Sequence, residues 1–383
     1  MTLQTLRSPA QLAEHDLVAP DAREALDAVA ARYAIAVPPA LAALIDRDDP
    51  NDPIARQFIP DVAELNHHPE EDADPIGDDA HSPVEGIVHR YPDRVLLKLT
   101  PVCAVYCRFC FRREMVGPGK PGALSPAAIA AALDYIRNDP NIWEVILTGG
   151  DPLVLSARRL RAVMGALSAI DHVKVVRIHT RLPVADPERI TPELVRAMKS
   201  KGRATYVAVH VNHSRELTPQ TRAGLARMAD AGLVLLGQSV LLKGVNDDAE
   251  VLAELMRALV ECRVKPYYLH HGDLAPGTAH LRTSIDTGQA LMRQLRGRLS
   301  GLCQPTYMLD IPGGDGKSPI GPSYIYRVGV NGGAHWAVED YSGRRHRYAS
   351  ELAVDRQQVE QRGGHRQAGE ADEHHRYDGV PDK

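Results

Sequence analysis

Between residues 93 and 309 the chain alternates short apolar runs with longer amphipathic segments, and this alternation restricts the fold more than any other feature. Short runs rich in β-branched and apolar residues are typical of buried strands, whereas capped segments with a helical period are typical of helices. The predicted strands are Val95–Leu99, Val145–Thr148, Val173–His179, Tyr206–Val211, Val234–Val240 and Val264–Leu269, with a further run at Thr306–Leu309. The predicted helices between them are Pro126–Arg137, Ala157–Ile170, Pro192–Lys199, Pro219–Ala231, Ala249–Glu261 and Gln289–Leu299.

Strands that alternate with helices form parallel sheets, because each helix carries the chain back to the edge where the previous strand began. Ser125-Pro126 and Thr218-Pro219 support the assignment, since a hydroxyl N-cap followed by proline is a strong helix start. A curved or closed sheet of this kind is a β/α barrel, with its functional groups at the C-terminal ends of the strands. The pattern alone is compatible with a six-stranded partial barrel and with an eight-stranded closed one.

The sequence on either side of this pattern divides the chain further. Residues 9–46 carry helical patterns, and the acidic, proline-bearing stretch His67–His81 is predicted to be a solvated loop rather than a metal site. We expect an N-terminal helical extension and connector over residues 1–90, a barrel over residues 91–303 and a C-terminal segment over residues 304–350. Residues 351–383 are predicted to be a polar, disordered tail. Its histidines are interpreted as exposed polar residues rather than metal ligands: His365, His374 and His375.

Composition narrows the class of protein. With 44% hydrophobic and 25% charged residues, the 383-residue chain is predicted to be globular. Its formal net charge of −4 gives no electrostatic case for a nucleic-acid partner. Because no apolar run has the length of a signal-peptide core or a membrane span, we expect a cytoplasmic protein without a membrane partner. Five cysteines, three of them in one short cluster, do not resemble a disulfide framework.

That cluster consists of Cys103, Cys107 and Cys110, just after the first predicted strand. Iron–sulfur clusters are held by cysteine thiolates, usually four, so three thiolates leave one iron open to a small molecule. A zinc knuckle would need a second closely spaced pair of ligands, which the sequence lacks. The spacing therefore favours a catalytic iron–sulfur cluster, and a non-catalytic module that binds iron–sulfur or zinc is the alternative.

The CxxxCxxC motif resembles the signature of radical S-adenosylmethionine (SAM) enzymes, and its flanks, residues 89–94 and 106–113, resemble the lysine 2,3-aminomutase family. The likeness runs from about residue 49 to about residue 324. It implies an α/β fold, a partial (β/α)6 TIM-like radical SAM barrel with an N-terminal helical extension and a C-terminal segment that carries a lysine for pyridoxal 5′-phosphate (PLP). It also implies three cofactors, namely a 4Fe–4S cluster on the three cysteines, SAM and PLP.

Polar groups at predicted strand ends are candidates for SAM contacts. Gly149, Gly150 and Asp151 close the second strand, where two glycines let a ligand approach the backbone, although a plain tight turn is the alternative. By resemblance this segment binds the amino group of SAM. His210 and Gln238, near the ends of later strands, resemble family positions that lie close to SAM.

The glycine-rich stretch from Asp310 to Pro319 presents a single lysine, Lys317. It is not a phosphate-binding P-loop, because Ile311 stands where that motif needs glycine and Pro319 opposes a helix after the lysine. The glycines instead predict a flexible loop. By resemblance Lys317 is the catalytic lysine to which PLP attaches, and a surface lysine in a turn is the alternative.

The phosphate of PLP needs an anion site. Arg181, after the third predicted strand, is a candidate together with Arg90 and Tyr91 before the first, because guanidinium groups match phosphate oxygens. A second glycine pattern, Gly117–Gly122, matches a dinucleotide-binding motif by letters only, since it lacks the flanking strand and helix.

Charge suggests how a substrate would be chosen. By resemblance Arg112 pairs with the carboxylate of L-lysine, and Asp273 and Asp310 pair with its ε-ammonium group. Two carboxylates around one buried ammonium disfavour glutamate, which would leave them unpaired. The implied reaction is an isomerisation in which a SAM-derived radical removes a β-hydrogen and the α-amino group moves to C3, giving β-lysine. A related aminomutase that acts on another amino acid, or on lysine for elongation factor P modification, is the alternative.

The sequence departs from the family in two respects. Clostridial-type relatives form a structural zinc site from a cysteine after a Gly-Val-Asn-Asp segment and a C-terminal cysteine cluster. Here Asp248 follows residues 244–247, and no cysteine lies beyond Cys303. We therefore expect no such zinc site, which leaves open any homo-oligomer that it would brace. The compact chain resembles the branch that supplies β-lysine for elongation factor P, and its cluster would need an external electron donor.

Overall fold

The computed structural model describes residues 4–117, 119–120, 122–328 and 335–348. Its contacts divide the chain into two compact units, residues 1–322 and residues 323–383. The predicted disordered tail and its three histidines lie outside the described residues. Within the described ranges, every helix is too short or too polar to cross a membrane.

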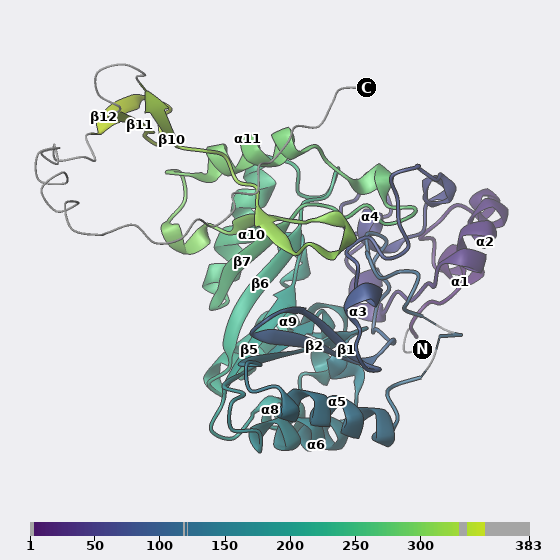
Figure 1. The fold of residues 1–383 in the computed structure, drawn as a ribbon. Coiled ribbons are helices and arrows are strands. Elements are labelled where there is room, and N and C mark those ends of the chain that lie inside the picture. Colours follow the sequence, from purple (N-terminus) through teal and green to yellow (C-terminus); the bar gives the residue numbers. More distant parts are fainter. Residues whose placement is uncertain (1–3, 118, 121, 329–334, 349–383) are drawn as a thin grey trace, which may run out of the picture. The chain divides into compact units, whose positions relative to one another are not determined.

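The first unit is built on a nine-stranded sheet whose strand order follows the chain from β1 to β9 (Figure 1). Strands β2 to β8 are parallel to one another, and the edge strands β1 and β9 pair antiparallel with β2 and β8. This curled, mostly parallel sheet confirms the predicted α/β half-barrel. The strands are β1 (Ile87–Tyr91), β2 (Arg94–Thr100), β3 (Glu144–Gly149), β4 (Val175–Thr180), β5 (Ala204–His210), β6 (Val234–Val240), β7 (Val264–His270), β8 (Thr306–Asp310) and β9 (Lys317–Pro319).

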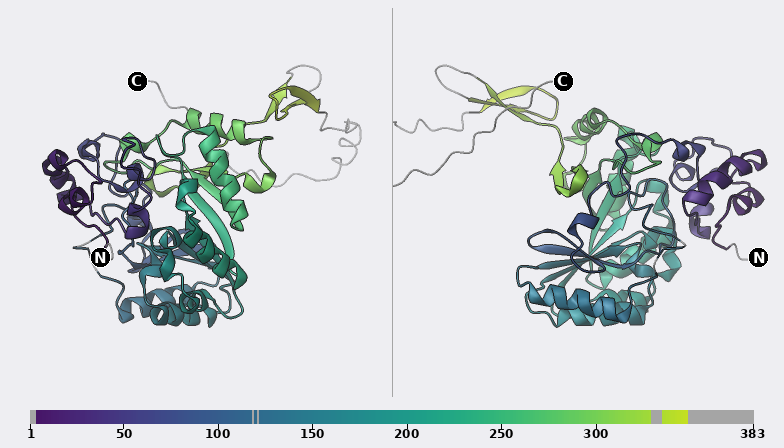
Figure 2. Two further views of the ribbon diagram at one scale, coloured as in Figure 1. Left: turned by 180° about the vertical axis from the view of Figure 1, so that it is seen from behind. Right: turned by 45° about the vertical axis from the view of Figure 1, so that its right-hand side comes forward.

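Helices connect successive parallel strands, as the alternation predicts (Figures 1 and 2). The connecting helices are α5 (Pro126–Asn138), α6 (Ala157–Ser168), α8 (Pro192–Met198), α9 (Pro219–Asp230), α10 (Ala249–Glu261) and α11 (Ile285–Leu295), with the short α7 (Leu182–Ala185) ahead of α8. Each of the six longer helices begins after a side chain that accepts a backbone N–H of its first turn: Ser125, Ser156, Thr191, Thr218, Asp248 and Ser284. Helix α11 starts earlier than predicted because Ser284 caps it by accepting from the Thr287 amide at 3.1 Å.

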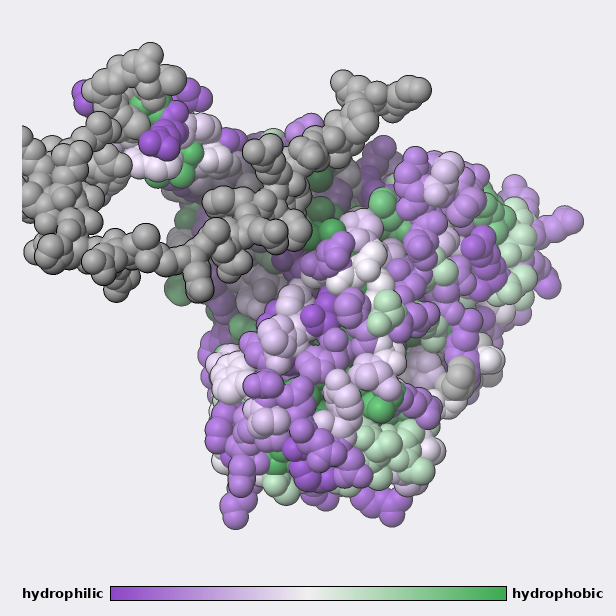
Figure 3. Space-filling model, in the orientation of Figure 1, coloured by the Kyte–Doolittle hydropathy of each residue, from purple (hydrophilic) through white to green (hydrophobic). Residues whose placement is uncertain are grey.

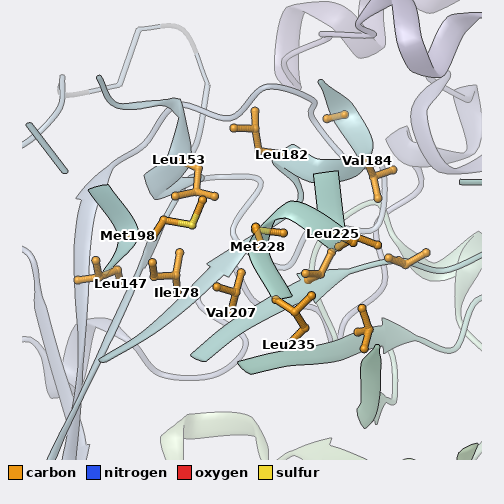
Figure 4. Close-up of a cluster of buried hydrophobic side chains, with 14 of the residues drawn as sticks. Leu147, Leu153, Ile178, Leu182, Val184, Met198, Val207, Leu225, Met228 and Leu235 are labelled. Atoms are coloured by element: carbon orange, nitrogen blue, oxygen red, sulfur yellow. The ribbon is translucent and has the colours of Figure 1, made fainter. Parts of the chain in front are cut away.

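Strand residues alternate between two environments. In β4, Val176 and Ile178 are fully buried in the main core, whereas Arg177 and His179 line a cavity on the other face of the sheet. Figure 4 shows the apolar side, where residues of the strands and of helices α8 and α9 pack together. Figure 3 shows hydrophilic residues together with a patch of weakly hydrophobic ones on the visible surface around α5 and α6. The helices therefore shield one face of the sheet and leave the other for a site.

The N-terminal segment contains the helices α1 (Pro9–Glu14), α2 (Arg23–Arg32), α3 (Pro39–Ala42) and α4 (Ala55–Phe58). Leu12, Leu41, Ile54 and Phe58 are buried and belong to the same core as the barrel strands. The chain up to β1 is therefore packed onto the barrel. Whether residues 1–90, 91–303 and 304–350 act as separate domains stays a prediction.

The stretch over residues 67–81 is largely a loop, as predicted, and residues 67–70 are exposed, but the prediction that it is solvated throughout is wrong. Glu71 is buried and pairs with Arg282 at 2.8 Å, and Asp78 has no exposed surface. Charged side chains are almost never buried unless they are paired, and ion pairs hold the buried carboxylates of Glu71 and Asp78. The sequence alone does not reveal the pair of Glu71, because Arg282 lies 211 residues further along the chain.

The second unit, taken by itself, contains a three-stranded antiparallel sheet of β10 (Ile325–Val328), β11 (His335–Glu339) and β12 (Arg345–Tyr348). Sequence analysis predicted none of these strands. Arg327 interrupts β10, only Trp336–Val338 is apolar in β11, and β12 is mainly basic, so these strands lie outside the regular alternation that marked the barrel strands. A turn around Asp340 joins the last two strands, and its carboxylate lies 2.7 Å from His346 Nε2.

Candidate active site

One cavity of about 580 Å³ lies on the strand face that the helices leave uncovered. All residues that sequence analysis proposed as site residues line it. They are Arg90, Tyr91, Cys103, Cys107, Cys110, Arg112, Gly149, Gly150, Asp151, Arg181, His210, Gln238, Asp273, Asp310 and Lys317. The three thiols and the Lys317 amine therefore share a chamber, although they are more than two hundred residues apart in the chain.

The cysteine loop is held against the end of β3 by the two glycines. A Cβ on Gly149 would lie 2.5 Å from the carbonyl oxygen of Thr100, and one on Gly150 would lie 2.3 Å from that of Val102. Gly149 also has a φ of +121°, which side-chain-bearing residues rarely adopt. The glycine pair is thus required by the close approach of the segment that leads into Cys103.

Asp151 ties the ends of two strands together. Its Oδ1 accepts hydrogen bonds from the Leu153 amide at 2.9 Å and from Thr180 Oγ1 at 2.8 Å. Its Oδ2 accepts from the backbone amides of Arg181 and Leu182 at 2.8 and 3.1 Å. Both oxygens are therefore engaged within the chain, and a contact of this side chain with SAM stays a prediction.

The three thiols are half-buried and lie close enough together for their thiolate forms to repel one another. Burial raises the pKa of Cys110 to about 11, and the neighbouring Cys107 adds to this shift. Burial likewise raises the pKa of Cys103 well above its usual value, with further contributions from Asp151 and the other two cysteines. Each thiol must lose its proton to bind iron, and the positive charge of the iron then stabilises the three neighbouring thiolates. The donor set therefore fits an iron–sulfur cluster.

Among the residues that the structure describes, no three His, Cys, Asp or Glu side chains converge on a point that could hold a single metal ion. An iron–sulfur cluster has a different requirement. Each thiolate binds its own iron, so the three sulfurs need to surround a volume and not a point.

The lysine segment differs from the predicted flexible loop. Lys317 is the first residue of strand β9, which pairs with β8 so that Lys317 lies opposite Asp310. The Lys317 Nζ forms an ion pair with the Asp310 carboxylate, and its backbone amide donates to Tyr91 Oη at 2.8 Å. Gly313, Gly314 and Gly316 have positive φ values and form the turn between the two strands. A short hairpin therefore aims the amine into the cavity.

The pKa values of two carboxyl groups near this amine are shifted in opposite directions. Burial raises the pKa of Asp273 to about 7, and the charge of Asp310 adds to the shift. Burial would also raise the pKa of Asp310, but a hydrogen bond with His270 and the charge of Lys317 hold it well below its usual value. The Asp273 Oδ1 atom is buried without a hydrogen-bond donor. This orphaned oxygen is suited to a ligand that brings an ammonium group.

Arg112 and Arg90 are joined by the buried carboxylate of Asp78. The Asp78 Oδ2 accepts from Arg112 Nε at 2.8 Å, and Oδ1 lies 3.2 Å from Arg90 Nη2. Burial would raise the pKa of Asp78, but the charges of Arg112, Lys98 and Arg90 hold it below its usual value. Asp78 was not predicted as a site residue because it lies in the acidic run that was predicted to be solvated.

His210 and Gln238 lie on neighbouring strands at the cavity wall. The His210 Nε2 is 3.1 Å from Asn212 Oδ1, and its ring centroid is 5.4 Å from that of Phe109 in the cysteine loop. The Gln238 amide nitrogen is 3.4 Å from His270 Nε2. Burial holds the pKa of His210 well below its usual value, so the ring is neutral at physiological pH.

Arg181 lies at the cysteine end of the cavity. Its Nη1 donates to Cys107 Sγ at 3.0 Å, and its Nη2 donates to Gln57 Oε1 and Glu216 Oε2, both at 2.7 Å. Two of its three nitrogens are thus engaged within the chain. A role in binding the PLP phosphate stays a prediction that this arrangement does not favour.

Several cavity residues were missed by sequence analysis. Arg177 and His179 of β4 and Tyr268 and His270 of β7 all line the chamber. A signal was present, because each pair occupies alternate positions of its strand and therefore points to one face of the sheet. The His179 Nε2 is buried and has no hydrogen-bond partner, and burial holds the pKa of this imidazole well below its usual value.

Comparison with known proteins gives consistent results. A family model described as the Radical SAM superfamily matches residues 97–256. The L-lysine 2,3-aminomutase of Clostridium subterminale is 45% identical over 291 residues, which cover 76% of this chain and 70% of that protein. A putative L-lysine 2,3-aminomutase of Aquifex aeolicus is 39% identical over 324 residues, covering 85% and 86%. The glutamate 2,3-aminomutase of Clostridioides difficile is 37% identical over 333 residues, covering 87% and 78%.

Proposed function

This chain belongs to the lysine 2,3-aminomutase family of radical SAM enzymes, and on that premise we propose that it moves the α-amino group of L-lysine to C3, giving β-lysine. Membership of the family implies a 4Fe–4S cluster, SAM and PLP as cofactors. The observation that supports the proposal best is the single chamber in which three thiols, a lysine amine and two carboxylates face one another.

Cys103, Cys107 and Cys110 are the proposed cluster ligands, and Lys317 is the proposed attachment site for PLP. When bound, the reduced cluster and SAM supply the radical chemistry, and PLP holds the migrating amine. The chain's own contribution is to hold the substrate carbon close to the radical source and to exclude water from the chamber. We assign Gly149, Gly150, Asp151, His210 and Gln238 to the SAM side of the cavity.

Asp310 also gives Lys317 a partner while the amine is free. The ion pair keeps the Lys317 amine in the chamber, and the carboxylate is positioned to take up or return a proton at Nζ. When the Lys317 amine is no longer paired with Asp310, the carboxylates of Asp310 and Asp273 can both pair with the ε-ammonium group of the substrate. Arg112 is the proposed partner of the substrate carboxylate, and Arg90 with Tyr91 of the PLP phosphate.

The charge of the chamber favours lysine over glutamate. Glutamate would bring a third carboxylate towards Asp273 and Asp310, and like charges at this depth repel strongly. Lysine would instead give a donor to the orphaned Asp273 Oδ1. The relative from Clostridioides difficile bears the name of a glutamate enzyme, so glutamate is the competing substrate to test.

The test is a turnover assay with anaerobically reconstituted protein, SAM, PLP and a chemical reductant that replaces the proposed external electron donor. Lysine and glutamate are supplied in parallel, and β-amino acids are sought by chromatography. We expect β-lysine and no β-glutamate. A protein that contains its cluster and binds PLP but forms only β-glutamate, or neither product, would refute the substrate assignment and leave the cofactor assignment intact.

A Lys317→Ala variant is the matched control for the role of PLP. It should retain the cluster and SAM cleavage but lose β-lysine formation and the absorbance of lysine-bound PLP. Full turnover by this variant would show that PLP does not act through Lys317.

A further inference from the structure

The position of Arg181 suggests a role that lies outside substrate and PLP binding. Its side chain is 7% exposed, and one guanidinium nitrogen donates to the sulfur of Cys107 at 3.0 Å. Cys107 is one of the three proposed cluster ligands. Arginine remains protonated in proteins, so this contact places a permanent positive charge directly on a cluster thiolate.

The surroundings of Arg181 hold this charge in place. Asp151 accepts the Arg181 backbone amide at 2.8 Å, which fixes where the side chain begins. At the other end, Gln57 and Glu216 both accept from Nη2. The rings of Phe58 and Phe109 lie 4.6 and 5.3 Å from the guanidinium carbon. The group is therefore bound on several sides and cannot swing away towards a ligand without breaking these contacts.

Glu216 is fixed just as firmly. It has no exposed surface, and its Oε1 accepts the backbone amides of Asn212 and His213 at 2.9 and 2.8 Å. Glu216 is the counterion of Arg181, and its negative charge offsets the free-energy cost of burying the guanidinium. The Cys107 sulfur, the Arg181 guanidinium and the Glu216 carboxylate thus lie in a row in which negative and positive charges alternate. The guanidinium is in contact with the sulfur.

Hydrogen bonds and charges at the ligating sulfurs set the reduction potential of an iron–sulfur cluster. A reduced cluster carries one more negative charge than the oxidised cluster, so a fixed cation beside a thiolate stabilises the reduced form more. The effect is strong where water is excluded. A radical SAM enzyme acts through the reduced cluster, so such a cation favours the active state.

We propose that Arg181 is a positioning residue of the cluster, which donates a hydrogen bond to the Cys107 thiolate and raises the reduction potential. This proposal replaces the predicted role of Arg181 at the PLP phosphate. It rests on the proposed ligation of the cluster by Cys107.

The test is a potentiometric titration of the reconstituted holoprotein, in which the electron paramagnetic resonance signal of the reduced cluster reports the midpoint potential. Arg181→Gln should shift the potential in the negative direction, because both the charge and much of the donor geometry are lost. Arg181→Lys should shift it less, since the charge stays. Glu216→Gln should shift it in the positive direction, because it removes an anion next to the guanidinium.

Arg189→Gln is the matched control, because the guanidinium of this arginine is also hydrogen-bonded within the chain but donates to the backbone carbonyls of Leu153 and Val154, in the connection after β3, and not to a cysteine sulfur. The midpoint potential of the cluster in this variant should equal that of the unmodified protein. Iron and sulfide analysis shows that each variant is fully loaded, and the PLP dissociation constant is measured in parallel. The proposal predicts no change in PLP affinity for Arg181→Lys.

The outcomes separate cleanly. A loaded Arg181→Gln variant with an unchanged potential would overturn the proposal, and a selective loss of PLP affinity would restore the phosphate role. If Arg181→Gln cannot hold a cluster, the opposite shifts expected of Arg181→Lys and Glu216→Gln decide the question, and shifts of the same sign would refute it. Failure of the unmodified protein to assemble any cluster would refute the proposed ligation itself, which is a different result.

Discussion

At the residue scale, the clearest feature is that Asp273 and Asp310 share one chamber but hold their protons differently. Burial and the charge of Asp310 raise the pKa of Asp273 to about 7, so this carboxyl is neutral below that pH in the free protein. Asp310 stays ionised because His270 and Lys317 support its charge. One site of the pair is thus always charged, and the other becomes charged only near neutrality.

This difference predicts a pH dependence for lysine turnover. Only the ionised form of Asp273 can pair with the ε-ammonium group, so kcat/KM for lysine should fall as the pH drops through about 7. Asp273→Asn should lower kcat/KM by roughly 10- to 100-fold, because a hydrogen bond between charged groups is lost. The variant should also lose the acidic limb of the profile.

The measurement is kcat/KM between pH 5.5 and 9 for both proteins, chosen to span the pKa. Cluster content must be constant across the range. An acidic limb that persists unchanged in Asp273→Asn would assign the titration to another group and contradict this account.

A second prediction at this scale concerns Asp78, which bridges Arg90, proposed to bind the PLP phosphate, and Arg112, proposed to bind the substrate carboxylate. Asp78→Asn removes the charge that holds Arg90 and Arg112 at a fixed separation, so PLP affinity should fall and KM for lysine should rise. Charged hydrogen bonds of this kind are worth about 1.5–3 kcal/mol, or roughly 10- to 100-fold in affinity. PLP titration and steady-state kinetics measure the two effects.

Asp79→Asn provides the control for Asp78. Asp79 is the next residue and is exposed, so its substitution changes the net charge equally without disturbing the buried pairs. Both constants should match those of the unmodified protein. Tighter binding of PLP by Asp78→Asn would show that the carboxylate competes with the phosphate and does not position its arginines.

At the scale of elements, the seven parallel strands and six connecting helices were predictable because each carries its own local signal. Val234–Val240 and Ala249–Glu261 were even predicted with the observed bounds. The edge strands β1 and β9 were missed because they depend on antiparallel partners that local patterns do not reveal, and β9 has only three residues. In the loop over residues 67–81, burial of Glu71 was missed for a related reason, since its partner Arg282 is distant in the chain.

Element packing gives a stability prediction at Gly288 in helix α11. A Cβ at this position would lie 2.1 Å from the hydroxyl of Tyr307, a buried residue of strand β8. Gly288→Ala should therefore destabilise the protein by about 1–3 kcal/mol, the usual cost of overpacking. Chemical denaturation monitored by circular dichroism would measure the change in the free energy of unfolding.

Gly165 of helix α6 is the matched control, because a Cβ there would meet no heavy atom within 4 Å. Gly165→Ala should stabilise the protein by about 0.5–1 kcal/mol, since alanine loses less backbone entropy in a helix. If both substitutions destabilise equally, the close contact with Tyr307 is not what requires glycine at position 288.

At the scale of the whole molecule, sequence analysis could name the members of the site but not their pairings. Motif positions brought the three cysteines, Lys317 and the two aspartates to one cavity, since strand ends of a parallel sheet converge. The contacts of Arg181 with Cys107 and of Arg112 with Asp78 could not be predicted. They depend on how long side chains cross the chamber, and such contacts between distant segments leave no local pattern in the sequence.

The division of the chain leads to a last prediction. Every residue proposed for the site lies before Pro322, within the first compact unit. The chain beyond Lys317 is still anchored to that unit, because the Ile320 amide donates to the carbonyl oxygen of Tyr307 at 2.9 Å and Gln289 donates to that of Ile320 at 2.9 Å. A protein ending at Pro322 therefore keeps the hairpin that aims Lys317 into the cavity.

We expect this shortened protein to assemble its cluster, to bind PLP and to form β-lysine with kcat/KM close to that of the full chain. The full chain, reconstituted in parallel, is the reference, and cluster content and PLP absorbance are measured before turnover is compared. Loss of PLP binding with an intact cluster would mean that residues 323–383 support the lysine hairpin. Loss of turnover alone, with the cluster and PLP both bound, would mean that residues 323–383 contribute to substrate binding or turnover. The first unit would then be sufficient to hold the cofactors.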